Sequence, residues 1–363
     1  IVAGGTLRVE ALGDNAAEYA VNVTSLKSIP TFSGGYAAAK TTVDAHVDRY
    51  AIVSSHDLSV LADTVNDVQA EVAPLELVDS QSSGMAVTVS ALDSDTTAFV
   101  DAVVTLAGDL DVVATTSTEN ENAAAAEPSS ATGGILGAGF GFVKDKISSK
   151  KNPAQSGAEK FEFSAGVAVT LSDNDSTAYI GSNAVVRAGG DVTVDATVVD
   201  DLRISATSTA EDAQVGISVS VSVAETDDHA TAYIADGAHV DAKGALVVRA
   251  STEIPNPLPD NAWGVFAPDA DTGAGAVTSV LASTINFEAL MFALFTSYTR
   301  SGAVFTDSGT QTSSGTTPRE SKLSLAGSAN WLDYDNGAEA YIGAGAYINQ
   351  DAAYRVAGQT VDI

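Results

Sequence analysis

The chain has 363 residues, and 45% of them are hydrophobic, so it can bury a large core. Its 47 acidic residues against 17 basic ones give a net charge of −30, which disfavours nucleic acids and anionic membrane surfaces as partners. No cysteine is present, which excludes disulfide bonds and thiolate metal ligands. The most apolar stretch, 285–298, is too short to span a bilayer, so we expect no membrane insertion.

A segment of about 52 residues recurs from the first residues onward. Each copy contains a short apolar strand that ends in alanine, as in GGDVTVDA (189–196) and KGALVVRA (243–250). The anchor residues of these strands are Leu7, Leu58, Leu110, Val192 and Leu246, followed by a degenerate copy at Val361. Their first four intervals are 51, 52, 82 and 54 positions, which predicts a repeat array enlarged by two insertions.

Alternation within each copy indicates which side chains face the core. The inward set in one copy is Val186, Ala188, Val192, Val194 and Ala196. Such small inward side chains favour a narrow solenoid interior. We therefore predict an all-β fold, a right-handed parallel β-helix in which each repeat of four or five short strands makes roughly two rungs. An antiparallel sandwich built from a duplicated hairpin is the alternative.

Stacked repeats should also place like residues above one another. Phe99, Tyr179, Tyr233 and Tyr341 occupy one equivalent position, as an aromatic ladder would require. The first residues match the second half of a repeat, and neither end resembles a capping repeat. We expect residues 1–363 to form a single solenoid segment, which continues in a longer chain or pairs with neighbouring copies in a filament.

The first predicted insertion covers residues 116–162. Its glycines Gly137, Gly139 and Gly141 lack the strand and helix that a phosphate-binding loop needs. It also concentrates basic side chains in a chain that has few: Lys144, Lys146, Lys150 and Lys151. A solvated loop explains this charge, and docking on an acidic face of a neighbouring solenoid is the alternative.

The second predicted insertion covers residues 253–320, with a proline-rich entry and an exit rich in serine, threonine and glycine. Helical spacing of apolar residues predicts an amphipathic helix over 286–300. Its apolar stripe is Phe287, Leu290, Met291, Leu294, Phe295 and Tyr298. We expect this stripe to pack on the solenoid flank, with contact to a partner chain as the alternative.

An acidic motif precedes the aromatic position in four copies. Its carboxylates are Asp93, Asp95, Asp173, Asp175, Asp227, Asp228, Asp333 and Asp335. Aspartate and asparagine cap turns without a metal, which predicts a corner of the solenoid. Calcium bound by carboxylates of successive rungs is the competing hypothesis. No complete calcium-binding motif is present, and no other cofactor is expected.

Catalytic motifs are scarce. His46, His56, His229 and His239 are far apart in sequence and form no metal-binding pair. The paired carboxylates Asp200-Asp201 are predicted to lie in a turn. We therefore predict that the protein is not an enzyme.

The stretch GVAVTLSDNDSTAYIGSNAVVRAGGDVTVDA (166–196) resembles the repeats of giant bacterial filamentous adhesins of the haemagglutinin-like and leukotoxin type. This resemblance covers about two-thirds of the chain and excludes both insertions. It implies a secreted, surface-anchored β-helix rod that mediates adhesion to a receptor or glycan on another cell, or forms an extracellular fibre. It brings no catalytic residues. A carbohydrate-binding or polysaccharide-cleaving β-helix is the alternative function.

Overall fold

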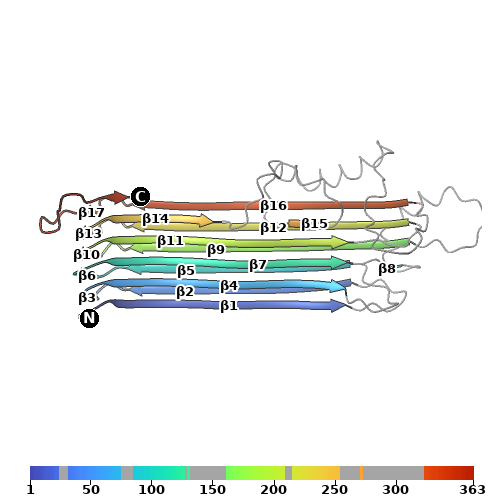
Figure 1. Cartoon of the computed structure of the whole chain (residues 1–363), viewed down its shortest axis with the longest axis horizontal. Helices are drawn as coiled ribbons and strands as arrows, with labels where there is room; N and C mark the ends of the chain where they lie inside the picture. The colour runs from blue at the N-terminus through green and yellow to red at the C-terminus, as the bar shows by residue number, and fades with distance from the viewer. Residues whose placement is uncertain are drawn as a thin grey trace, which may run out of the picture.

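The computed structural model describes residues 1–23, 32–74, 85–126, 129–130, 161–208, 215–253, 270–272 and 323–363. Their strands form three sheets that run side by side through a stack of coils, with the two termini at opposite ends of the stack (Figure 1). All strand pairs are parallel except the short β8–β9 pair. The predicted parallel β-solenoid is therefore confirmed, and the antiparallel sandwich is wrong.

Each coil contributes one strand to each sheet. The first sheet contains β1 (Leu7–Val23), β4 (Leu58–Pro74), β7 (Leu110–Ala126), β11 (Val192–Ser208), β14 (Leu246–Glu253) and β18 (Val361–Asp362), with β15 (Ala270–Thr272) beside β11. The second contains β2 (Phe32–Val47), β5 (Met85–Val100), β9 (Phe161–Ile180), β12 (Val215–Ile234) and β16 (Leu323–Ile342), with β8 (Ser129–Ser130) beside β9. The third contains β3 (Ile52–Ser55), β6 (Val103–Leu106), β10 (Val185–Ala188), β13 (His239–Ala242) and β17 (Tyr347–Ile348).

The repeat anchors pair directly with one another. Leu7 pairs with Leu58, which pairs with Leu110, and the series continues through Val192 and Leu246. One repeat is therefore one coil, and the prediction of two rungs per repeat is wrong. Repeats of about 52 residues fit a single coil because its two long strands are 16 to 20 residues each in most coils.

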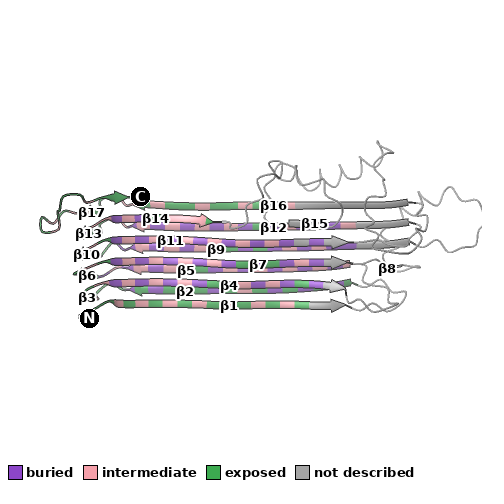
Figure 2. Cartoon of the chain, in the orientation of Figure 1, coloured by how far each residue is buried: buried purple, intermediate pink, exposed green. Residues whose placement is uncertain are grey.

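The predicted inward face is confirmed. Val186, Val192 and Val194 are completely buried, as are Ala188 and Ala196. Buried and more exposed residues alternate along the long strands (Figure 2). The largest apolar cluster occupies the end of the coils next to the short third sheet, where all three sheets supply its side chains.

The aromatic ladder is also confirmed. The ring centroids of Phe99 and Tyr179 are 4.8 Å apart, those of Tyr179 and Tyr233 are 4.9 Å apart, and those of Tyr233 and Tyr341 are 5.1 Å apart. The rings are within 7° of parallel, and His46 extends the stack below Phe99. These separations match the spacing of hydrogen-bonded strands, so each coil adds one ring.

A second ladder explains why the repeat contains Gly-Gly-Asp. Asp57 accepts a hydrogen bond from the main-chain nitrogen of Asp109 (3.0 Å), and Asp109 accepts one from that of Asp191 (2.8 Å). Each carboxylate occupies the space that a side chain would need at the glycine of the next coil, as Asp109 does at Gly190. The glycine is required because the carboxylate approaches its backbone so closely.

The first insertion begins later than predicted. Residues 116–126 continue β7 and pair with β11, so the first insertion does not begin at residue 116. Lys144, Lys146, Lys150 and Lys151 lie outside the described residues. The same is true of the predicted helix over 286–300 and its apolar stripe. Within the part of the chain that the structure describes, no helix is long and apolar enough to cross a membrane.

Candidate metal centre

The predicted acidic corner lies in the middle of long strands. Asp93 belongs to β5, Asp173 to β9, Asp227 to β12 and Asp335 to β16, and they pair in that order across the second sheet. We call these four residues the outer acidic ladder. The turn-capping interpretation is wrong, because a strand that exposes every second side chain accommodates aspartate on its wet face without a turn.

The other four predicted carboxylates separate into three groups. Asp95 and Asp175 pair with each other two residues after the outer acidic ladder, on the same outward face. His229 occupies the third position of this row. Asp333 is exposed and pairs with Glu225 two residues before the outer acidic ladder. Asp228 faces the opposite way and is only 1% exposed, inside the solenoid. The structure therefore places seven of the eight on one outer surface and Asp228 alone inside.

Crowding of like charges changes the acidity of these groups. Burial raises the pKa of the Asp173 carboxyl, and the carboxylates of Asp227 and Asp93 raise it further. Burial and Asp173 raise the pKa of Asp175 in the same way. The part of each shift that comes from neighbouring carboxylates reflects repulsion between like charges in the rows, which a bound cation would relieve.

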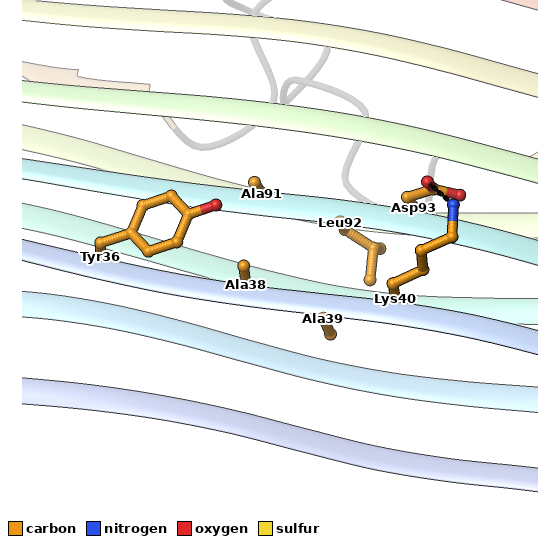
Figure 3. Close-up of a pocket in the computed structure, with 7 residues that line it drawn as sticks. All are labelled: Tyr36, Ala38, Ala39, Lys40, Ala91, Leu92 and Asp93. Carbon is orange, nitrogen blue, oxygen red and sulfur yellow. Dashed lines mark hydrogen bonds and ion pairs between the residues drawn. The ribbon is translucent and has the colours of Figure 1, made fainter.

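A lysine neutralises one end of the outer acidic ladder. Lys40 in β2 pairs with Asp93 in register and forms an ion pair with its carboxylate (Figure 3). This hydrogen bond raises the pKa of the Lys40 ammonium. The two residues border a shallow surface depression of about 340 Å³ that is otherwise lined by Tyr36, alanines and Leu92. Because Lys40 already neutralises Asp93, this end offers little to a metal ion.

The opposite end of the ladder gathers a set of metal ligands. One ligand atom each of Asp227, His229 and Asp335 lies within 4.8 Å of the others. The Nε2 atom of His229 is 2.8 Å from Oδ1 of Asp227. Two carboxylates and an imidazole suit a transition metal such as zinc, whereas calcium prefers oxygen ligands alone. Calcium therefore fits this end of the predicted row poorly.

The position of His229 beside Asp227 and Asp335 is not evident when His229 is compared only with the other histidines. The informative signal is its repeat position, which Asp95 and Asp175 occupy in earlier copies. The other described histidines have separate local contacts. His56 lies 2.8 Å from Asp57, and His239 stacks on Tyr347.

The interior contains a second acidic group. Asp200 lies within β11, so the prediction that Asp200-Asp201 occupies a turn is wrong. Its side chain is inward and the residue is 2% exposed, whereas Asp201 pairs with Arg203 on the outside. Burial, followed by the carboxylate of Asp228, raises the pKa of Asp200 well above its usual range. Burial also raises the pKa of Asp228 to about 6.

These contacts define a parallel β-solenoid with one acidic outer surface and one acidic interior site. No family model, curated protein or solved structure matches the chain. The function of the chain is therefore inferred from its own geometry and from the resemblance of its repeats.

Proposed function

We propose that the chain is a structural or adhesive segment of a large secreted bacterial surface protein, in which stacked coils form an extracellular filament. One observation supports this proposal above the others. Equivalent residues of every repeat stack in register through the first sheet from β1 to β18. Such a stack can be extended by further coils without any change in its cross-section.

The dimensions give the filament a particular shape. A strand of 20 residues such as β9 is about 65 Å long, whereas each coil adds only ~4.8 Å along the stack. The filament would therefore be a broad blade whose strands run across its axis. Its wide faces would offer large polar surfaces for attachment, and a net charge of −30 favours partners with basic patches.

The carbohydrate-binding alternative gains no support from the described residues. Sugar-binding sites commonly use exposed aromatic ring faces beside polar groups. Within the aromatic ladder the faces of Tyr179 and Tyr233 are covered by neighbouring rings. The depression beside Asp93 offers only Tyr36 as an aromatic. This alternative stays a prediction from the sequence.

Electron microscopy of the native assembly tests the proposal. We expect continuous filaments about 65 Å wide, with a repeat of ~4.8 Å along the axis in their diffraction. Separate globular particles without an axial repeat would contradict it.

A further inference from the structure

Two facing rows of polar side chains cross the interior of the solenoid. On the first sheet the row contains Asn15, Asn66, Thr118 and Asp200, which pair in this order. On the second sheet it contains Thr41, Ser94, Asn174, Asp228 and Asn336. We call these nine residues the interior polar rows. They separate the main apolar cluster from two smaller ones farther along the strands.

In the first coils these rows are neutral and hydrogen-bonded. Asn15 Nδ2 donates to Thr41 Oγ1 (2.7 Å), and Thr41 Oγ1 donates to Asn66 Oδ1 (2.9 Å). One coil later, Thr118 Oγ1 donates to Asn174 Oδ1 (3.0 Å). Amides and hydroxyls serve as donors and acceptors in turn, so these buried groups are satisfied without any charge.

The next coil replaces this neutral pairing with two carboxyls. Since Thr118 reaches Asn174, the following coil brings Asp200 of β11 opposite Asp228 of β12. Asp228 Oδ1 accepts a hydrogen bond from Asn174 Nδ2 (2.7 Å). By contrast, neither carboxylate oxygen of Asp200 has a hydrogen-bond partner, and the same is true of the Tyr334 hydroxyl.

Neither lysine nor arginine lies buried beside the pair in the part of the chain that the structure describes. A buried carboxylate without a counter-charge or hydrogen bonds is strongly destabilising, so ions of this kind are normally paired or coordinate a metal. The two oxygens of Asp200 and the hydroxyl of Tyr334 are thus buried without a hydrogen-bond partner.

We propose that Asp200 and Asp228 bind one calcium ion inside the solenoid, with a neutral oxygen from the Tyr334 hydroxyl. The side-chain amide of Asn336 reaches within 3.2 Å of Asp228 Oδ2 and 3.3 Å of the main-chain oxygen of Asp335. Its nitrogen faces these two oxygens and donates a hydrogen bond to each, which holds the Asp228 carboxylate in place. Asn336 is solvent-exposed, which gives the ion a route to Asp228.

This site is distinct from the outer ligands. Asp228 is buried inside the solenoid, whereas Asp227, His229 and Asp335 lie on the outer face of the same two strands. The interior set offers only oxygens, which calcium prefers, and the outer set includes an imidazole. Two carboxylates would neutralise the double charge of the ion.

Calcium titration of the full chain, by calorimetry and by thermal unfolding after treatment with a chelator, tests the proposal. We expect one calcium ion to bind at pH 7.5 and to raise Tm. Asp200→Asn should weaken binding by about tenfold or more and abolish the Tm increase. Asp201→Asn is the matched control, because it makes the same change one residue away on the outer face, and it should retain both effects.

A second variant keeps the test decisive if Asp200→Asn does not fold. Asp227→Asn combined with Asp335→Asn removes the outer carboxylates and should leave the stoichiometry of one calcium ion unchanged. Three results would overturn the proposal: a wild-type Tm that ignores calcium, an undiminished effect in Asp200→Asn, or loss of binding in the outer double variant. The first would mean that the pair holds a proton instead, and the others would place the ion outside.

Discussion

The residue that fits at a given position of this solenoid depends on the side chain that the preceding coil places beside it. Gly108 and Gly190 stand where Asp57 and Asp109 project from the preceding coil. The aspartates satisfy main-chain nitrogens, and the hydrogen bond from the Asp109 nitrogen is the main reason why the pKa of Asp57 is lowered. The Gly-Gly-Asp motif of the repeat is therefore a contact between coils.

Gly190→Ala should destabilise the protein. The new Cβ would overlap Asp109 Oδ1 and displace it from the main-chain nitrogen of Asp191. We expect the free energy of unfolding to fall by about 1–2 kcal/mol, the contribution of a charge-assisted hydrogen bond. Urea denaturation measures this change.

Gly5→Ala is the control for this substitution. Gly5 occupies the equivalent position in the first coil, and nothing lies within 4 Å of a Cβ built there. Equal losses in the two variants would show that backbone flexibility, and not the carboxylate contact, explains the glycine.

At the scale of elements, β11 and β12 face each other through ionisable groups. Asp200 lies on the inner face of β11, while Asp227 and His229 flank Asp228 on β12. On β16, burial raises the pKa of Tyr334, and the carboxylates of Asp200 and Asp228 raise it further. The folded state therefore holds protons on Asp200 and Asp228 that the unfolded chain releases.

Without calcium, stability should fall as the pH rises. Because the pKa of Asp228 is raised from 3.8 to about 6, the folded state binds more protons between these values. This contribution is complete below pH 4 and is lost as the pH passes through about 6. Urea denaturation in chelator at pH 5 and pH 8 should show a smaller loss in Asp228→Asn than in the wild type.

Asp201→Asn separates this effect from general charge repulsion. It removes the same charge from the outer face, so its stability should follow the wild-type dependence on pH. An equal loss of stability between pH 5 and pH 8 in wild type and Asp228→Asn would contradict the assignment.

At the scale of the whole molecule, features that repeat were predictable from sequence. The anchors Leu58 and Leu110 and the ladder of Tyr179 and Tyr233 were visible because stacking places like residues in register. Repetition alone does not reveal how many strands fill one period. Polar residues inside long strands resemble turns, so the sequence predicts four or five short strands and two rungs where the structure has one coil.

The acidic site was only partly predictable for a related reason. Local propensity assigns Asp173 and Asp200 to turns, because aspartate readily bonds its own backbone. Their strand conformation depends on partners far away in sequence, such as Asn174 with Thr118 across the interior. The strand pairing places Asp173 on the outer face, and only the facing sheet shows that Asp200 lies opposite Asp228.

One repeat makes one coil of the solenoid, and a disulfide cross-link tests this directly because the chain has no native cysteine. Thr97 pairs with Thr177, and Thr177 pairs with Thr231. Neighbouring coils are ~4.8 Å apart, within the Cα separation that a disulfide bridges, whereas two coils are separated by ~9.6 Å. We predict that Thr97→Cys with Thr177→Cys forms the bond under mild oxidation, and that Thr97→Cys with Thr231→Cys does not. Failure of the first pair to cross-link, or equal cross-linking of both pairs, would contradict the account.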